Sequence, residues 1–190
     1  MPCKSCGKEG KGAHHNSSTC QEKKEQAPIP LEPCVKEKLL LLAEICKEVA
    51  AGLKKGRVEC VYQAAVCQEL QMRYIPFTAE ETIPIMYKEK FVGIERIDVC
   101  IGSVFLDFLY EFKATGSEIK PENLWQVISY LNHKGYNYGA VVNFNQSVKG
   151  SLEIQFVVRK EGVWYLTDVE KEVGEVMVDY AFLSKERNAE

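Results

Sequence analysis

The stretch that decides the fold is residues 91–113, which read FVGIERIDVCIGSVFLDFLYEFK. Apolar and β-branched residues alternate with polar ones through 91–99 and again through 104–113. A period of two is typical of β-strands, because successive side chains point to opposite faces of a sheet. A similar run, TIPIMY at 82–87, comes just before. The three segments predict a meander of adjacent strands.

Helices are expected on both sides of this meander, because apolar residues recur there every three or four positions. The helical stretches are residues 34–53, 58–74 and 121–132. The nearly all-apolar run YGAVVNF at 138–144 is typical of a buried strand, and strand-like runs follow at 152–158 and 163–167. This order predicts an α/β fold with one central mixed sheet flanked by helices. No glycine-rich turn opens a helix after a strand, which argues against a doubly wound nucleotide-binding fold.

Composition and charge exclude some classes of protein. The 190 residues are 46% hydrophobic and 27% charged, as in globular proteins. The formal net charge of -3 means that a site for a polyanion has to be local. The longest apolar run, residues 39–43, is far too short to cross a bilayer. Since the first residues lack an apolar signal segment, we expect an intracellular protein, cytoplasmic or nuclear, that is neither secreted nor bound to a membrane.

The chain divides into four predicted parts. Residues 1–26 form a polar leader, and the proline-rich residues 27–33 are interpreted as an extended linker. The globular domain is expected at 34–167, followed by a C-terminal extension at 168–190.

A candidate catalytic group lies at the end of the third strand. Glu111 and Lys113 are two residues apart, so they share a face about 7 Å apart along the strand. A second acid, Asp98, lies in the preceding strand. Metal-dependent phosphodiester hydrolysis uses carboxylate oxygens for Mg²⁺ and an ammonium group near the water or the phosphate. The alternative is a charged pair on a solvated face.

Six motifs in order resemble those of the GxxExxY proteins, a branch of the PD-(D/E)XK nuclease superfamily. GRVECVY fits GxxExxY, ETIPIMYK and VGIERID fit ExIPIxYK and VGxxRxD, and EFKA fits ExKA. QVISYL fits QxxxYL, and GAVVNF fits the final strand motif. They occupy residues 56–62, 81–88, 92–98, 111–114, 126–131 and 139–144. The resemblance implies a restriction-endonuclease-like core and a nuclease domain over residues 34–167.

The resemblance also assigns roles to particular residues. Asp98 and Glu111 would bind Mg²⁺ or Mn²⁺ with Glu59 completing the metal site, and Lys113 would be the catalytic lysine. The alternative role for Glu59 is that of an acid favoured at a helix N-terminus.

Two more residues of the candidate site, Gln126 and Tyr130, lie one helical turn apart. They match a pair that steadies the site and approaches the substrate backbone in RecB-like nucleases. Packing in the core is the alternative role for Tyr130. Arg96 is either the ion-pair partner of Asp98 or a phosphate contact.

The spacing between the two metal-binding acids departs from the family pattern. A tight turn at 102–103 would place Asp98 opposite Asp107 and leave Glu111 about 13 Å away along the sheet. A bulge or a wider loop would bring the two acids together. In addition, Leu-Lys-Lys-Gly at 53–56 replaces the usual Leu-Gly-Pro-Gly.

The leader resembles a zinc knuckle of the type C-x2-C-x4-H-x4-C, with a longer central gap. Cys3, Cys6, His15 and Cys20 are the predicted Zn²⁺ ligands, with His14 as the alternative histidine. Four N or S ligands suit tetrahedral Zn²⁺. The competing interpretation is an unfolded leader with cysteines placed by chance.

Together these features predict a metal-dependent nuclease that hydrolyses phosphodiester bonds of nucleic acid, with DNA favoured over RNA. The alternative is a catalytically inactive module that keeps the fold and binds nucleic acid or protein.

Overall fold

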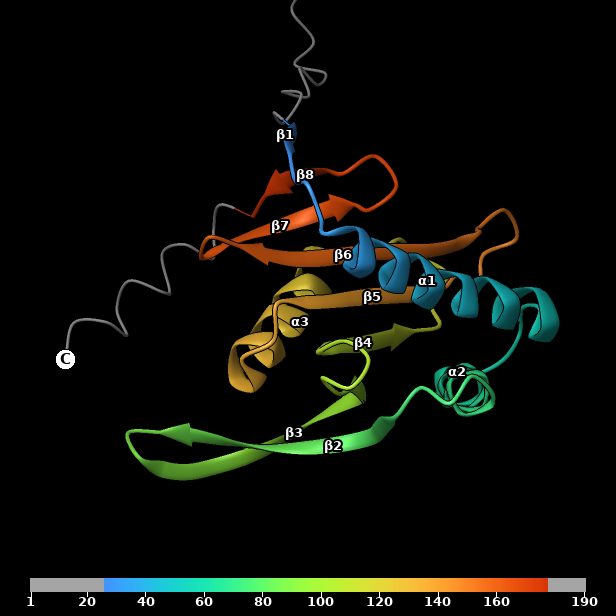
Figure 1. Ribbon diagram of the computed structural model, residues 1–190. Helices are drawn as coiled ribbons and strands as arrows, with labels where there is room; N and C mark the ends of the chain where they lie inside the picture. The colour runs from blue at the N-terminus through green and yellow to red at the C-terminus, as the bar shows by residue number, and fades with distance from the viewer. Residues whose placement is uncertain (1–25, 178–190) are drawn as a thin grey trace, which may run out of the picture.

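A computed structural model describes residues 26–177, and these residues form eight strands and three helices (Figure 1). The predicted zinc ligands in the leader, and residues 178–190, lie outside this range. The elements are β1 (Gln26–Pro28), α1 (Pro33–Leu53), α2 (Glu59–Met72), β2 (Phe77–Tyr87), β3 (Lys90–Ile101), β4 (Phe108–Lys113), α3 (Pro121–Lys134), β5 (Tyr138–Phe144), β6 (Leu152–Lys160), β7 (Val163–Asp168) and β8 (Val173–Val176).

The strands form one mixed sheet in the order β1-β8-β7-β6-β5-β4-β3-β2. Every neighbouring pair is antiparallel except β4 and β5, which are parallel. Parallel neighbours need a crossover connection, and α3 supplies it between β4 and β5. The predicted α/β fold with a mixed sheet is confirmed.

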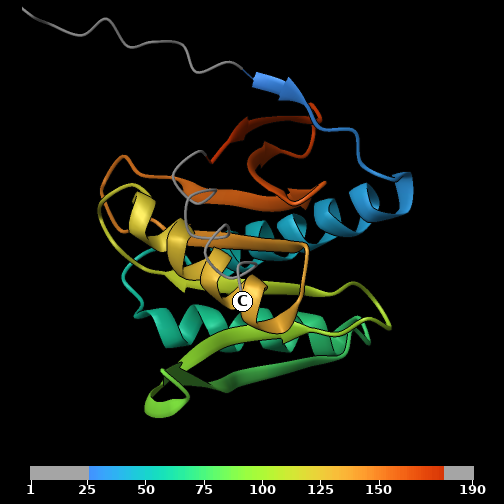
Figure 2. The same ribbon diagram turned by 90° about the vertical axis from the view of Figure 1, so that its left-hand side faces the viewer.

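Helices cover both faces of the sheet (Figure 2). α1 and α2 bury Leu39, Leu42 and Tyr62 against one face, and α3 buries Val127 and Leu131 against the other. Each helix follows the apolar spacing seen in the sequence. α3 ends at Gly135, whose φ of 70° is a left-handed conformation that glycine adopts readily. In the described part of the chain, no helix combines the length and hydropathy needed to span a lipid bilayer.

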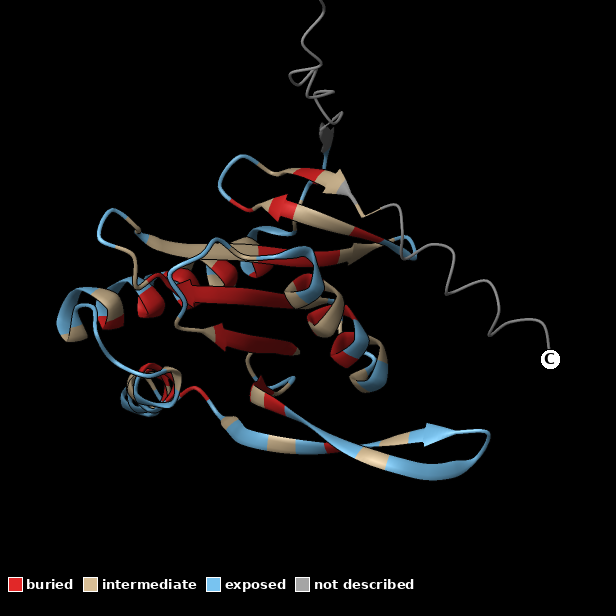
Figure 3. Cartoon of the chain, turned by 180° about the vertical axis from the view of Figure 1, so that it is seen from behind, coloured by how far each residue is buried: buried red, intermediate tan, exposed pale blue. Residues whose placement is uncertain are grey.

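The β2–β3 hairpin projects beyond the helices and is mostly exposed (Figure 3). Its outer half carries exposed Met86, Tyr87, Phe91 and Ile94. β2 is also an edge strand of the sheet and contains Pro84. The hairpin contributes to the core through Ile83 in the middle of β2 and through Ile97 and residues 99–101 of β3.

The sheet extends past both ends of the predicted 34–167 domain. Gln26–Pro28 pairs with Val173–Val176, and Ile29 in the predicted linker is buried. Strand β8 therefore occupies part of the predicted C-terminal extension. β4 begins at Phe108 rather than at the expected residue 104, because residues 102–107 form a loop.

Candidate functional site

Asp98 and Glu111 come together where β3 and β4 separate. The last registered pair of the two strands is Val99 with Tyr110. The next position along each strand brings Asp98 opposite Glu111. The backbone N–H of Phe112 donates to Asp98 Oδ2 at 2.7 Å, which fixes the Asp98 side chain against β4. The strands thus hold both predicted metal-binding acids at one point.

The loop at 102–107 sets this register. Its Leu106 side chain is buried, and the Phe105 carbonyl accepts a hydrogen bond of 2.5 Å from Lys38 on α1. The loop is therefore anchored to the core as a wide connection. A tight turn, which would have placed Asp107 opposite the β3 acid, does not form. The long spacing between the acids is absorbed by the loop.

Glu111 and Lys113 point to the same side of β4 and form an ion pair. Lys113 Nζ donates to Glu111 Oε1 at 2.5 Å. The Glu111 side chain is only 4% exposed. Its second oxygen, Oε2, is buried without a hydrogen-bond partner. A buried carboxylate oxygen without a partner is unfavourable, so this atom is suited to an added cation or proton.

The surroundings of Glu111 favour its protonated form. Burial raises the pKa of Glu111 to about 7, and the charges of Asp98 and Glu59 raise it in the same direction. The hydrogen bond from Lys113 opposes this shift. Burial is also the main reason that the pKa of Asp98 lies above its usual value. The acids therefore repel one another, and a divalent cation would relieve that repulsion.

Glu59 is the first residue of α2, and its charge acts on that of Glu111. Burial raises the pKa of Glu59 above its usual value, as does the charge of Asp98. The charge of Lys113 and the backbone N–H of Ala114 lower it. Glu59 therefore belongs to the same electrostatic cluster, although its place at a helix N-terminus also suits an acid.

Gln126 and Tyr130 lie on α3, and Gln126 Nε2 donates to the Tyr130 hydroxyl at 2.8 Å. Tyr130 is buried in the core beneath α3. Burial raises the pKa of Tyr130, and the charges of Glu111 and Asp98 add to the rise. The pair thus adjoins the acids from the α3 side of the sheet, and Tyr130 also packs in the core.

The structure adds two residues that the sequence did not indicate, Gln63 and Glu80. The buried Gln63 Nε2 contacts Glu80 Oε1 at 2.6 Å and the backbone carbonyl of Asp98 at 3.0 Å. Gln63 lies one helical turn after Glu59, so its place on the same face of the helix was the only signal in the sequence. Glu80 has a φ of 57° inside β2, a conformation that is uncommon for a residue other than glycine.

Arg96 pairs with Glu80 rather than with Asp98. Its Nε lies 2.5 Å from Glu80 Oε2, and the Arg96 side chain remains 65% exposed. Glu80 therefore holds the guanidinium by one oxygen and accepts from Gln63 by the other. This leaves the carboxylate of Asp98 without a cationic partner at hydrogen-bond distance in the described chain.

The donor set fits a hard divalent cation. Across residues 26–177, no group of three or more His, Cys, Asp or Glu side chains converges tightly enough to form a ready-made metal site. However, Asp98, Glu111 and Glu59 offer carboxylate oxygens, which Mg²⁺ and Mn²⁺ prefer. The buried, unpartnered Oε2 of Glu111 is the position that such an ion would satisfy.

The chain is similar to a known protein family. A family model described as the PD-(D/E)XK nuclease superfamily matches residues 37–156, which is more than half of the chain. Neither the curated proteins nor the solved structures include a significant match. The matched region contains Glu59, Asp98, Glu111 and Lys113. The chain therefore belongs to the PD-(D/E)XK nuclease superfamily.

Proposed function

We propose that this domain is a divalent-metal-dependent nuclease that hydrolyses phosphodiester bonds, with DNA as the favoured substrate and RNA as the second. The observation that carries the proposal is the unpartnered Oε2 of Glu111, buried beside a second acid and a lysine. The ion pair with Lys113 uses only Oε1, and Oε2 is left buried and without a hydrogen-bond partner. An oxygen left free at this point is suited to a metal ion.

In this proposal Asp98, Glu111 and Glu59 hold Mg²⁺ or Mn²⁺. A bound ion would supply Lewis-acid chemistry, since it would polarise the phosphate and lower the pKa of a water molecule that serves as the nucleophile. The residues of the chain supply the rest of the site. The N–H of Phe112 keeps Asp98 turned toward β4, and Gln63 fixes the backbone of Asp98.

Lys113 is suited to stabilise charge and to position water. Burial lowers its pKa, but the hydrogen bond from its ammonium to Glu111 and the charges of Glu59 and Asp98 outweigh burial, so the net pKa is raised. Lys113 is therefore cationic at neutral pH. It can donate hydrogen bonds to the attacking water and to a phosphate oxygen, rather than accept a proton.

We infer that the domain belongs to the GxxExxY branch. Two motif residues have structural roles that support the inference. Gly56 has a φ of 91°, a left-handed conformation that favours glycine. The Tyr62 hydroxyl donates to the Lys54 carbonyl at 2.5 Å and so fixes the loop that precedes Glu59.

A cleavage assay on single- and double-stranded DNA and RNA, with Mg²⁺, Mn²⁺ or EDTA, tests the nuclease proposal. Cleavage that requires the metal supports it. Binding of nucleic acid without cleavage, together with no metal binding by calorimetry, would instead favour an inactive module.

Glu80→Ala is expected to weaken Mn²⁺ binding about tenfold, because Arg96 would be free to turn toward Asp98 and compete with the metal. Titration calorimetry measures the affinity. Arg96→Met alone should change it by less than about threefold, and the double variant should return close to wild type. Glu89→Ala removes an acid at the hairpin tip and serves as the control for charge. Additive effects of the two site substitutions would contradict the prediction.

We also propose that the leader binds one Zn²⁺ through Cys3, Cys6, His15 and Cys20. Thiolates prefer zinc whereas the carboxylates prefer harder ions, so the two sites should separate by metal type. Elemental analysis should find one zinc in the wild type and none in a Cys3→Ser/Cys6→Ser variant. Cys60→Ser, at an exposed free thiol of α2, should retain the zinc. Wild-type protein purified without chelators and lacking zinc would contradict the proposal.

A further inference from the structure

Two loops at one end of the sheet are joined by hydrogen bonds. The first lies between α1 and α2, and the second, residues 145–151, lies between β5 and β6. Lys55 Nζ in the first loop contacts the carbonyl oxygens of Ser147 and Gly150. The Gly56 N–H donates to Gln146 Oε1 at 2.6 Å. The two loops therefore form one unit.

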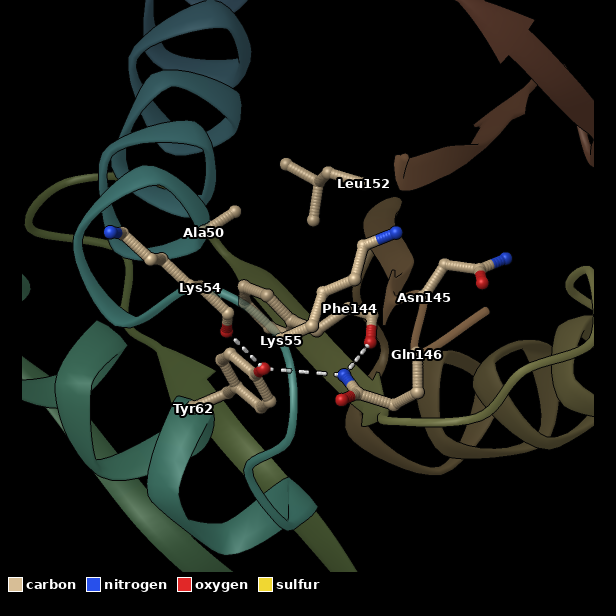
Figure 4. A pocket seen from close by; sticks show the side chains of 8 residues that line it. All are labelled: Ala50, Lys54, Lys55, Tyr62, Phe144, Asn145, Gln146 and Leu152. Atoms are coloured by element: carbon tan, nitrogen blue, oxygen red, sulfur yellow. Dashed lines mark hydrogen bonds between the residues drawn. The ribbon is translucent and has the colours of Figure 1, made fainter. Parts of the chain in front are cut away.

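Side chains that line a small cavity beneath these loops also connect them (Figure 4). Gln146 Nε2 donates to the Tyr62 hydroxyl at 3.2 Å, and the Tyr62 ring stacks on Phe144 with centroids 4.3 Å apart. A Cβ at Gly150 would lie 2.0 Å from Asn145 Oδ1, so the backbone at Gly150 packs directly against the Asn145 side chain. The hydrogen bonds of Gln146 to Tyr62 and to the Phe144 carbonyl therefore tie the lining of the cavity together.

These loops carry a group of four cations that we name the basic rim. Its members are Lys54, Lys55, Arg57 and Lys149. All four are exposed, and none forms an ion pair with an acid in the described residues. By contrast, Arg73, Arg96 and Lys134 each pair with an acid. Lys55 is fixed by neutral carbonyl oxygens, so its charge is not cancelled.

The basic rim is joined through the backbone to the segments that carry the acids of the candidate site. Arg57 precedes Glu59 by two residues. On the other side, the Gln146 N–H donates to the Thr115 carbonyl at 2.8 Å, and Thr115 follows Lys113 by two residues. The rim is therefore connected on both sides to residues that surround Asp98 and Glu111.

The phosphates of a nucleic acid are repelled by these acids, so nearby cations are needed to offset the repulsion. Glu59, Asp98 and Glu111 are acidic, and the whole chain carries a net charge of -3. Favourable binding of a polyanion then depends on local cations that displace counterions from its phosphates. The basic rim is a group of such cations, with no competing acid partner and on a fixed framework.

We propose that the basic rim binds the sugar-phosphate backbone of the nucleic acid, next to the phosphodiester that lies at Asp98 and Glu111. This inference rests on the proposed nuclease function. Lys54, Arg57 and Lys149 make the phosphate contacts. Lys55 chiefly holds the two loops together.

The test compares two triple variants that lose the same charge. Lys54→Ala/Arg57→Ala/Lys149→Ala removes the phosphate contacts and keeps Lys55 and its hydrogen bonds. Lys47→Ala/Lys160→Ala/Lys171→Ala removes three cations from α1, the end of β6 and the β7–β8 turn. Thermal melting confirms that both variants fold.

Fluorescence anisotropy measures binding to a labelled single strand and to a labelled duplex over a range of salt concentrations. Ca²⁺ replaces Mg²⁺, and a gel confirms that the probe stays intact. For the rim variant, the slope of log affinity against log salt should become shallower by about two to three, or about 0.7–0.9 for each lost phosphate contact. Affinity at low salt should fall at least about tenfold, whereas the control variant should stay within about threefold of wild type.

The possible failures are distinct. If the wild type binds both probes and the two triple variants are equal in affinity and slope, the basic rim does not contact phosphate and this inference is overturned. If the wild type binds neither probe, the nuclease proposal itself fails and the inference fails with it. Binding of poly-glutamate in place of either probe would assign the rim to acidic protein partners instead.

Discussion

Replacement of Lys113 by methionine is expected to slow cleavage at least about 10²-fold at saturating metal while the domain stays folded. The loss follows from removing the only described cation that touches the Glu111 carboxylate. The fold survives because Glu111 takes up a proton when Lys113 no longer lowers its pKa. Cleavage rates are measured over a range of Mn²⁺ concentrations, with circular dichroism to follow folding.

Lys134→Met is the matched control for this experiment. Lys134 pairs with Glu81 at 2.5 Å, the same distance as in the Lys113 pair, and the two lysine side chains are 21% and 20% exposed. The control therefore removes a lysine of the same exposure from an ion pair of the same length, whose acid is 29% exposed instead of 4%. Equal losses of activity in the two variants, or activity within about tenfold of wild type after Lys113→Met, would remove the lysine from the mechanism.

The second large effect is expected from Glu111→Gln, which should remove much of the pH dependence of the protein's stability. The folded pKa of Glu111 is about 7, above the unfolded value of about 4.3. The folded state therefore holds this proton more tightly, and its contribution to stability is complete below about pH 4.3 and is lost as pH rises through 7. The free energy involved is of the order of 3 kcal/mol.

Thermal melting without metal should show this effect directly. The wild type should lose about 5–10 °C between pH 5 and pH 8 through this group, and the Glu111→Gln variant should not. At pH 8, Mn²⁺ should raise the melting temperature of the wild type and leave the variant nearly unchanged. A variant that keeps both responses would show that Glu111 is neither the titrating group nor a metal ligand.

Glu81→Gln provides a control of opposite sign. The hydrogen bond from Lys134 lowers the pKa of Glu81, so the stability from this acid is present above its unfolded pKa and is lost as the pH falls. The Glu81→Gln variant should therefore lose stability near neutral pH and keep its response to Mn²⁺.

The sequence predicted the order of elements well, because helical and strand periods report local burial. Its main uncertainty concerned the register of two acids that are separated by 12 residues. That register depends on burial of Leu106 and on a hydrogen bond from Lys38, which lies far away in sequence. Such contacts between distant segments leave no periodic pattern. From the sequence alone, a wide loop and a tight turn therefore remained alternatives.

Glu80 shows a different limit of sequence-based prediction. Glu80 has a left-handed backbone conformation within a strand, and a glutamate in the sequence does not predict that conformation. The proline-rich residues 27–33 show a third limit. They suggested a linker, but pairing of β1 with β8 and burial of Ile29 include part of this segment in the fold.

The open edge of β2 has a consequence for the protein at high concentration. An edge strand with a continuous row of free N–H and C=O groups can recruit strands from other molecules and start aggregation. Pro84 supplies no N–H, and the left-handed backbone at Glu80 breaks the extended conformation a few residues earlier. The edge therefore presents short, interrupted runs of donors, which oppose growth of the sheet from one molecule into the next.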